Sequence, residues 1–365
     1  MTKKPFNLPE LPPDFDYSQV FTSIIDARDI VARYDEAIKR LPNPEIIQRT
    51  FETKEAVLSS KIEGTQADFD DVQLFDAQEI KTEKSDKEKD YREISNYRSA
   101  IKQGKEFLKE KPLSENLIKA LHKILLDSDR GQNKAPGQFR KIQVFIGAYG
   151  ASIEEATFIP PPPQEISRLF SNFENYLHAD DKVDPLVKIA IAHYQFEAIH
   201  PFLDGNGRIG RLLVPLFLYE KNLTAHPNIY ISEFLEKHRD IYYELLNAVS
   251  KKNEWIPWIR FFLEAIQIQT ENTLNQVVKI EKLYQELKEK MPELNSIYAN
   301  SFLDALFIKP RFTAKSIREL TGVTNTQTLY NLIDKFIEFD IIKDIYPQKE
   351  RNKIYAFTDL IKIVR

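Results

Sequence analysis

The sequence predicts a mainly α-helical protein with a small β-hairpin flap and a C-terminal winged helix-turn-helix. Apolar residues recur with helical spacing over most of the chain, and few stretches alternate with a period of two. Glycine accounts for only 10 of the 365 residues. A chain of this length exceeds the usual size of one domain, so we expect two or three units.

Composition narrows the function classes. The chain is 42% hydrophobic and 29% charged, which is typical of a soluble globular protein, and its net charge of -4 gives no overall attraction for nucleic acid or acidic membranes. It has no cysteine, which excludes disulfides, thiolate nucleophiles and cysteine zinc sites. The N-terminus lacks an apolar signal core, and the apolar run 212–219 is too short to span a bilayer. We therefore expect a cytoplasmic protein.

Amphipathic helices account for the first third of the chain. The spacing of apolar residues predicts them over residues 24–41, 45–62, 95–108 and 113–127. Ser114 is suited to cap the last of these helices. The stretch 78–92 mixes acidic and basic residues densely, which is typical of a solvated loop or helix face.

The pattern changes over residues 130–163. Glycines and short β-like runs between Phe139 and Ile146 predict a hairpin or flap in an otherwise helical protein. The four prolines at 160–163 indicate a rigid extended exit from this hairpin, although they could instead recruit a partner domain. Helices resume from residue 164 to about residue 286.

The C-terminal region has the order of a winged helix. It contains helices at 298–307, 313–320 and 326–339, followed by strand-like runs at 341–346 and 353–357. We therefore expect an N-terminal helical region at 1–108, a core at 109–286 and a winged-helix domain at 287–365.

The most informative stretch is the segment HPFLDGNGRIGR, residues 200–211. Pro201 disfavours helical geometry at the preceding residue, which places His200 at the end of the apolar helix 186–199. Asp-Gly-Asn-Gly is strong turn chemistry, with two glycines free to take positive φ. A new helix then begins near Arg208, so successive N–H groups at its start form an anion-binding nest.

The side chains of this segment suit a complex of magnesium and a polyphosphate. Arg208 and Arg211 are three residues apart, so we expect both guanidinium groups on one helix face beside the nest. Asp204 supplies a hard oxygen ligand for Mg²⁺, which binds through few carboxylates plus substrate phosphates. Neutral His200, with an ordinary pKa of roughly 6.5, can accept a proton near physiological pH. Each residue alone also fits a structural role, but together they predict an active site.

The segment resembles the Fic family motif HPFxDGNGRxxR at every specified position, and the resemblance extends over most of the chain. It implies a Fic helical core that transfers AMP from ATP to a Ser, Thr or Tyr hydroxyl of a protein, including itself, and releases pyrophosphate. By this resemblance His200 would deprotonate the target hydroxyl, and Asp204 would hold Mg²⁺. The implied ATP contacts are Glu63, His200, Gly205, Asn206, Gly207, Arg208, Ile209, Gly210, Arg211 and Tyr243.

Other chemistries of the family stay open. Related Doc-type kinases carry a lysine at the second motif glycine, so Gly207 at this position favours AMP transfer. Phosphocholine transfer also occurs in the family, and the loop does not exclude it. A further alternative is a DNA-binding transcriptional regulator whose Fic core senses nucleotide.

Residues 59–64 resemble the family's inhibitory helix motif S/T-x-x-x-E-G/N. Ser59 and Glu63 are four residues apart and share one helix face. In the family the glutamate pairs with the second motif arginine, here Arg211, and prevents ATP from binding with its γ-phosphate correctly placed. Taken alone, Glu63 and Gly64 also form an ordinary helix stop.

The sequence also predicts roles for three other regions. The flap at 140–160 resembles the family's flap, which holds the target protein as an added strand; a stabilising hairpin is the alternative. Residues 230–232 and 239–243 resemble the family's segment that lines the nucleotide-base pocket, and within it Tyr243 is the preferred adenine contact. His122 and His193 have apolar neighbours and are expected to be structural. The recognition helix 326–339 has one lysine and no arginine, so we favour protein docking or a homodimer over DNA binding through 313–357.

Overall fold

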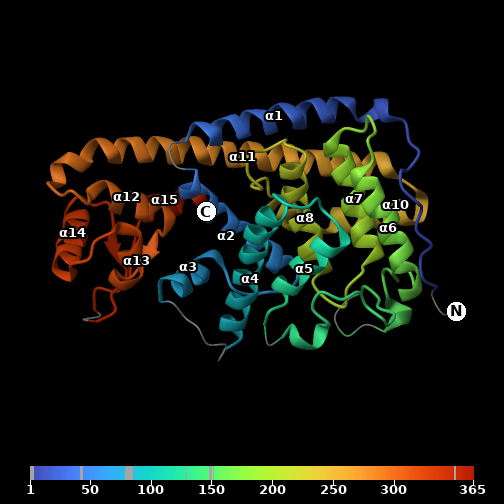
Figure 1. Ribbon diagram of the computed structural model, residues 1–365, viewed down its shortest axis with the longest axis horizontal. Coiled ribbons are helices and arrows are strands. Elements are labelled where there is room, and N and C mark those ends of the chain that lie inside the picture. Colours follow the sequence, from blue (N-terminus) through green and yellow to red (C-terminus); the bar gives the residue numbers. More distant parts are fainter. Residues whose placement is uncertain are drawn as a thin grey trace. The chain divides into compact units, whose positions relative to one another are not determined.

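The computed structural model describes residues 4–41, 44–78, 85–128, 130–147, 150, 152–348 and 351–365 (Figure 1). Its contacts group the chain into two compact units. The first contains Met1–Asp35, Leu58–Thr65 and Arg92–Glu271, and the second contains Glu36–Val57, Gln66–Tyr91 and Asn272–Arg365. The three domain ranges given above divide the chain differently and remain a prediction.

The described part of the chain is mainly helical, as predicted. The helices of the first unit are η1 (Tyr17–Val20), α5 (Glu115–Leu125), η2 (Gln132–Lys134), η3 (Ile153–Glu155), η4 (Pro163–Glu165), α6 (Ile166–His178), α7 (Pro185–Ile199), α8 (Asn206–Glu220), α9 (Ser232–Lys237) and α10 (Arg239–Lys252). The helices that contribute residues to both units are α1 (Phe21–Arg40), α2 (Glu45–Ile62), α4 (Asp86–Phe107) and α11 (Trp255–Lys290).

Helix α7 lies in the core of the first unit. It packs against α6 and α8 (Figure 1), and nearly all of its side chains are buried, as expected for a helix that is apolar on every face. Asp184 caps its N-terminus by accepting a hydrogen bond from the Leu186 N–H at 2.8 Å, and Pro185 occupies the first turn. Because Pro201 follows, the helix ends at His200, whose φ is 48°. The predicted position of His200 is therefore correct.

Two predictions for the N-terminal helices have clear outcomes. Ser114 caps α5, with its Oγ accepting from the Leu117 N–H at 3.4 Å, as predicted. Helix α4 begins at Asp86, well before the predicted residue 95, because Ser85 and Glu88 form reciprocal side chain–backbone hydrogen bonds at its start. Residues 86–92 of the charged stretch are thus helical, and 79–84 lie outside the described residues.

The predicted β-hairpin is reduced to a single contact. Within the described residues of 140–160, strand pairing is one antiparallel bridge between Ile146 and Phe158. The Gln143 amide donates instead to the Pro160 carbonyl at 2.9 Å, and the prolines from 160 onward have no N–H with which to extend a ladder. The described residues of the flap therefore form a loop closed by one bridge.

The second unit carries a small antiparallel sheet of strand order β1-β3-β2, in which Ala356 faces both Arg311 and Lys343. Thr313 and Asn325 cap its two adjacent helices, α13 and α14. The elements of this unit are α3 (Phe69–Gln78), η5 (Met291–Leu294), α12 (Ala299–Ile308), β1 (Arg311–Phe312), α13 (Ala314–Thr321), α14 (Thr326–Glu338), β2 (Lys343–Asp344), β3 (Tyr355–Ala356) and α15 (Thr358–Val364). Their order agrees with the predicted one, and the assignment to a winged helix remains a prediction.

No helix in the described ranges combines the length and the apolar character needed to cross a bilayer.

Candidate functional site

The turn between α7 and α8 is closed by the side chain of Asn206. Its Oδ1 accepts from the Phe202 N–H at 2.8 Å, and its Nδ2 donates to the Phe202 carbonyl at 2.9 Å. Gly205 has a φ of 76°, which favours glycine, and α8 begins at the next residue. The N–H groups of Asn206, Gly207 and Arg208 have no acceptor within the helix because they belong to its first turn. The turn thus presents a row of N–H groups to an anion.

His122 of α5 supports the same turn. Its Nδ1 accepts from the Gly137 N–H at 2.8 Å, so its Nε2 carries the proton and donates to the Asp204 carbonyl at 2.9 Å. The ring stacks on Phe202 with centroids 3.7 Å apart. Burial lowers the pKa of His122 to about 4, which keeps it neutral at pH 7. His122 is structural, as expected, and it positions the backbone of Asp204.

His200 is held so that one ring nitrogen is available as a base. Its Nδ1 donates to the Glu197 carbonyl at 3.3 Å, which leaves Nε2 as the proton acceptor. Burial lowers the pKa of His200 to about 4, so the ring is neutral at physiological pH.

Arg140 ties this histidine to the flap. Its Nε donates to the His200 carbonyl at 2.8 Å, and its two Nη atoms donate to the carbonyls of Ile142 at 3.2 Å and Pro161 at 2.6 Å. The Arg140 N–H also donates to the Pro201 carbonyl at 2.9 Å. One buried guanidinium therefore joins the end of α7 to both sides of the flap.

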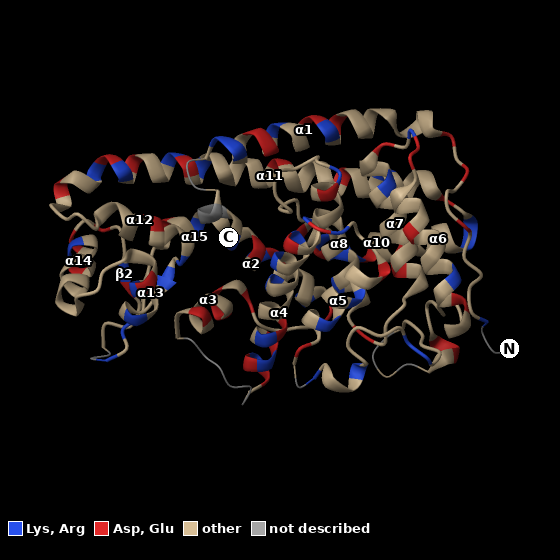
Figure 2. Ribbon diagram, viewed as in Figure 1, with Lys and Arg blue, Asp and Glu red and all other residues tan. Residues whose placement is uncertain are grey.

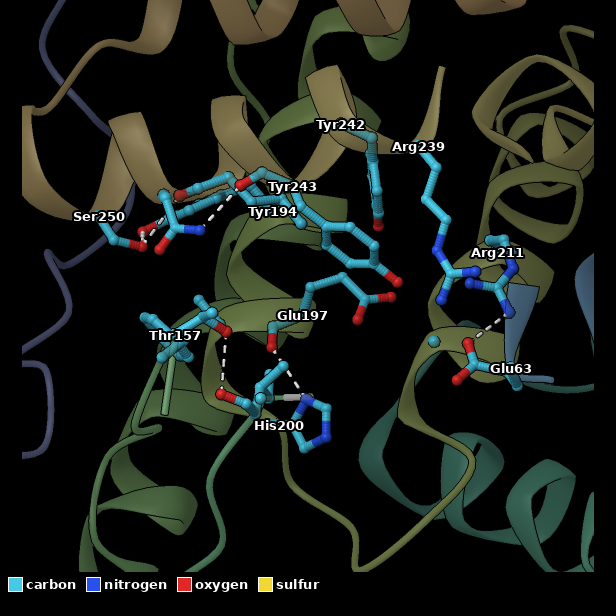
Figure 3. Close-up of a pocket in the computed structure, with 17 residues that line it drawn as sticks. Glu63, Thr157, Tyr194, Glu197, His200, Arg211, Arg239, Tyr242, Tyr243 and Ser250 are labelled. Carbon is cyan, nitrogen blue, oxygen red and sulfur yellow. Dashed lines mark hydrogen bonds and ion pairs between the residues drawn. The ribbon is translucent and has the colours of Figure 1, made fainter. Parts of the chain in front are cut away.

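Arg211 is bound on several sides by the end of α2. Its Nε donates to Ser59 Oγ and its Nη2 to the Ser59 carbonyl, both at 2.8 Å. Figure 3 shows the third contact, in which Nη2 donates to Glu63 Oε1 at 2.7 Å. Burial alone would raise the pKa of Glu63, but the charge and the hydrogen bond of Arg211, with smaller contributions from Arg208 and His200, together lower it. The Arg211 side chain is 2% exposed and that of Glu63 is 37% exposed. The ion pair thus has one solvent-accessible member.

The Glu63 carboxylate also covers the start of α8. A Cβ atom at Gly207 would lie 2.3 Å from Glu63 Oε1 and 2.9 Å from Arg211 Nη1, so only glycine permits this approach. A helix N-terminus attracts anions because its N–H groups are unpaired and its dipole is positive there. An acidic side chain of the protein therefore lies in the position that suits a phosphate.

Arg208 binds other acids. Its Nη1 donates to Glu93 of α4 at 3.0 Å, and its Nη2 donates to Asp204 at 3.4 Å. The Arg208 side chain is buried, but it too lowers the pKa of Glu63, to a smaller extent than Arg211. The two motif arginines thus lie near the same carboxylate and hold different partners.

A pocket of about 370 Å³ opens beside these residues. In Figure 3 the Glu63–Arg211 pair lies at one end and Tyr194 and Ser250 at the other, with His200 along the side. The flap contributes residues 146–147 and 157–158 to the lining. The pocket is therefore bounded by the motif, the flap and α10 together.

The predicted ATP contacts divide into two groups. Those that line the pocket are Glu63, His200, Gly207, Arg211 and Tyr243. The others lie in the turn or in α8. Ile209 is fully buried and its N–H donates to the Gly205 carbonyl at 3.0 Å, so its inclusion rests on the resemblance alone.

The two tyrosines of α10 have different surroundings. Both line the pocket, but Tyr243 is 37% exposed, whereas Tyr242 is almost fully buried. The Tyr242 hydroxyl donates to His193 Nε2 at 2.9 Å, and His193 Nδ1 donates to the Gly210 carbonyl at 3.1 Å. His193 therefore joins α7, α8 and α10 and is structural, as expected.

Glu197 is a pocket residue that the sequence reasoning missed. Its Oε1 is buried without a hydrogen-bond partner among the described residues, and a Cβ atom at Gly210 would lie 2.2 Å from it. Burial raises the pKa of Glu197 to about 8, although Arg211 opposes this shift, so the carboxyl is largely protonated at pH 7. The available signal was an acidic residue in an otherwise apolar helix just before the motif.

Family models match most of the N-terminal and central chain. The model described as the Fic/DOC family matches residues 112–218, and the model described as the Fic/DOC family N-terminal matches residues 21–106. Together these ranges cover more than half of the chain and include α2, the turn and most of α8.

Curated relatives resemble part of the chain. The protein adenylyltransferase Fic of Culex quinquefasciatus is 36% identical over 141 residues, and that of Aedes aegypti is 33% identical over 141 residues. Each match covers 38% of this chain and 24% of the relative. The matched part thus spans about a quarter of the length of these relatives.

Solved structures share the fold. A Fic family protein from Desulfovibrio desulfuricans G20 aligns with 95% of this chain and 98% of its own, at a TM-score of 0.61 and 19% identity. Fic-1 from C. elegans aligns with 72% of this chain and 74% of its own, at a TM-score of 0.55 and 17% identity. From the motif, the site and these matches, the chain belongs to the Fic/DOC family.

Proposed function

We propose that this protein is an adenylyltransferase that moves AMP from ATP to a hydroxyl group of a protein. The observation that carries the proposal is the Glu63 carboxylate bound between Arg211 and Gly207, because it marks an anion site at the start of α8 beside His200. The naming of the curated relatives as adenylyltransferases supports the same reaction.

The proposed reaction needs a base and an exposed phosphorus. Neutral His200 accepts the proton of the attacking hydroxyl through Nε2 as the hydroxyl oxygen bonds to the α-phosphorus. The bond from that phosphorus to the β-bridging oxygen breaks, and pyrophosphate leaves with the bonding electrons. AMP stays on the acceptor oxygen. The N–H groups of Asn206 and Gly207 and the side chain of Arg211 would stabilise the charge that develops on the phosphates.

Asp204 fits a magnesium ion bound together with the nucleotide. Its side chain is 43% exposed, and its Oδ1 accepts from the Gly205 N–H at 2.6 Å and from Arg208. Its Oδ2 accepts no hydrogen bond from the described residues, so that oxygen is available. Mg²⁺ needs few protein ligands when substrate phosphates supply the rest. When bound, the ion would neutralise charge on the phosphates.

We further propose that Glu63 inhibits the enzyme. The guanidinium of Arg211 is a natural partner for a phosphate, and in this structure Glu63 and Ser59 occupy its donors. A γ-phosphate and the Glu63 carboxylate cannot use the same donor at once. ATP in a productive position therefore requires that Glu63 move away from Arg211.

The flap is the proposed contact for the acceptor protein. Ile142 and Phe145 expose 62% and 40% of their surface on it, and Arg140 fixes its base to the His200 backbone. A segment that pairs with the flap would be aligned with the base. Exposed apolar side chains on the flap would add affinity.

The test uses ATP labelled at either the α- or the γ-phosphate, with Mg²⁺, on wild type, His200→Ala and Glu63→Gly. The proposal expects protein-bound label from α-labelled ATP only, lost in His200→Ala and increased in Glu63→Gly. Label transferred only from the γ-phosphate would identify a kinase instead. No covalent label in Glu63→Gly under any condition would overturn the proposed activity.

A further inference from the structure

Arg239 is a cation in the pocket that neither the motif nor the inhibitory pair accounts for. It is the first residue of α10 and lines the pocket together with Glu63, Gly207 and Arg211. In Figure 3 its side chain extends toward the end of the pocket where Arg211 meets Glu63. Its donors are thus directed toward the position that suits a phosphate.

The three arginines of this site differ in the side chains with which they pair. Arg208 is paired with Glu93 and Asp204, and Arg211 with Ser59 and Glu63. Arg239 has no acidic partner among the described residues. Its guanidinium lies over the face of Tyr243, with Cζ 5.7 Å from the ring centroid. A guanidinium on an aromatic face keeps its N–H donors available, because these lie in the plane of the group.

We propose that Arg239 is a third phosphate-binding arginine of the site and contacts the terminal phosphate of the nucleotide. This inference rests on the proposed use of ATP. The adenine base of ATP would lie toward Tyr194 and Ser250, at the end of the pocket away from Glu63 and Arg211. The phosphates would then extend toward Arg239 and Arg211. Since Glu63 does not bind Arg239, this cation is available to a nucleotide even while Arg211 is held.

The assignment has a consequence for specificity. The terminal phosphate that would face Arg239 is present in a nucleoside triphosphate and absent in a monophosphate. Arg239 would therefore favour ATP over AMP, whereas the N–H groups at Gly207 would serve either nucleotide. A charge-assisted, bidentate arginine–phosphate contact is stronger than a neutral hydrogen bond, and its loss typically weakens binding by about tenfold or more.

The experiment compares Arg239→Gln, Arg239→Lys and the parent, all carrying Glu63→Gly so that Arg211 is released. Affinities for ATP, ADP and AMP are measured by calorimetry, and AMP transfer is followed with α-labelled ATP. We expect Arg239→Gln to raise Kd and KM for ATP by about tenfold, with kcat changed little and AMP affinity unchanged. Arg239→Lys should recover part of the ATP affinity, because it keeps the charge without the planar fork.

The control is Lys237→Gln in the same background. Lys237 is exposed on α9, pairs with Glu233 at 2.8 Å and does not line the pocket, so its substitution removes one positive charge nearby without touching the site. It should leave ATP and AMP affinities unchanged. An equal effect of Lys237→Gln and Arg239→Gln on ATP affinity would mean a general charge effect and would overturn the assignment.

The remaining outcomes separate this inference from the proposed function. Equal weakening of ATP and AMP by Arg239→Gln would place the contact at the nucleoside or α-phosphate and refute the terminal-phosphate role. Unchanged nucleotide affinity would refute it as well. If the parent binds ATP but transfers no AMP, the proposed function fails, and the ATP-to-AMP affinity comparison still decides the role of Arg239.

Discussion

His200 owes its availability as a proton acceptor at neutral pH to its surroundings as well as to its residue type. Its Nδ1 is occupied by the Glu197 carbonyl, its own carbonyl accepts from Arg140, and burial lowers its pKa from about 6.5 to about 4. A lowered pKa favours the neutral ring, which is the form that accepts a proton. Protonation of His200, which removes the proton acceptor, therefore begins at a lower pH than for an ordinary histidine.

The first prediction concerns the acid side of the pH profile. In the Glu63→Gly background, kcat/KM for AMP transfer should be nearly constant from about pH 5.5 to about pH 7.5 and fall only toward pH 4, because His200 becomes protonated near that value. His200→Ala should reduce the rate by roughly 10²–10⁴-fold at pH 7. A rate profile with an inflection near pH 6.5 would contradict the burial argument for His200.

The second prediction concerns Glu197. Its pKa is about 8 in the folded protein and near 4.5 when exposed, so the folded state binds a proton that the unfolded state releases between these values. The stability contribution of this proton is present below pH 4.5 and lost as pH rises toward 8. Glu197→Gln, which stays neutral, should therefore be more stable than wild type at about pH 8.5, on the order of 5 kcal/mol, and about equal at pH 4.5.

Urea unfolding at the two pH values measures this difference. The substituted glutamine keeps the shape of the Glu197 side chain against Gly210, so packing changes little. The same stabilisation at both pH values would show that ionisation of Glu197 is not the cause.

At the scale of elements, the end of α2 meets the beginning of α8. Ser59 and Glu63 lie one helical turn apart and contact the same guanidinium, so the last turn of α2 acts as one rigid ligand of Arg211. Gly64 then ends the helix with a φ of 101°. Both interpretations of residues 59–64 are compatible, since the turn of Glu63 and Gly64 that follows α2 places Glu63 directly after the helix.

The third prediction concerns this contact. Glu63→Gly should raise self-labelling with AMP by at least about tenfold, since it frees a donor set that binds phosphate with charge assistance. Glu63 lies beyond the last residue of α2, so glycine there does not interrupt the helix. Quantitative autoradiography of the purified protein measures the effect.

The matched control is Lys61→Ala. Lys61 lies in the same turn and pairs with Glu236 at 2.9 Å, so its removal breaks an ion pair of α2 without touching Arg211. We expect no increase in labelling. Activation by Lys61→Ala equal to that of Glu63→Gly would attribute the effect to loosening of α2 and would contradict inhibition by the carboxylate.

Local patterns in the sequence predicted the parts of this site that depend on neighbouring residues. Pro201 placed His200 at a helix end, Ser114 capped α5, and the spacing of Ser59 and Glu63 put both on one face. Each of these follows from the geometry of a few consecutive residues. The same reasoning missed the early start of α4, although its capping box was present in the sequence.

The parts of the site that the sequence left open depend on contacts between residues that are far apart in the sequence. Glu93 and Arg208 are 115 residues apart, and no periodicity connects them. The resemblance placed residues 239–243 beside the nucleotide base, but only the fold shows that Arg239 lines the same pocket as Glu63 and Arg211. The reduced flap also depends on tertiary contacts, because Gln143 and the prolines replace a ladder that the β-like runs predicted.

At the scale of the whole molecule, charge is the property that bears on partners. The net charge is -4, and α14, the expected recognition helix, carries Lys335 as its single basic residue (Figure 2). The Lys335 ammonium donates to the Leu294 carbonyl at 2.6 Å and is therefore engaged within the second unit. The exposed side chains of α14 include Gln327, Asp334 and Glu338, which do not attract phosphates.

The fourth prediction follows from this charge distribution. The protein should not bind duplex DNA at concentrations up to about 10 μM in roughly 100 mM salt, because non-specific affinity depends on counterion release by Lys and Arg contacts to phosphates. Fluorescence anisotropy of a labelled duplex measures this. The double variant Gln327→Lys, Asn331→Lys adds two cations to the exposed face of α14 and shows whether the assay would detect such contacts. Binding of DNA by wild type that weakens steeply with salt would instead favour the nucleotide-sensing regulator. Because α14 has so few cations, the contacts to the DNA phosphates would then have to come from other basic residues of 313–357.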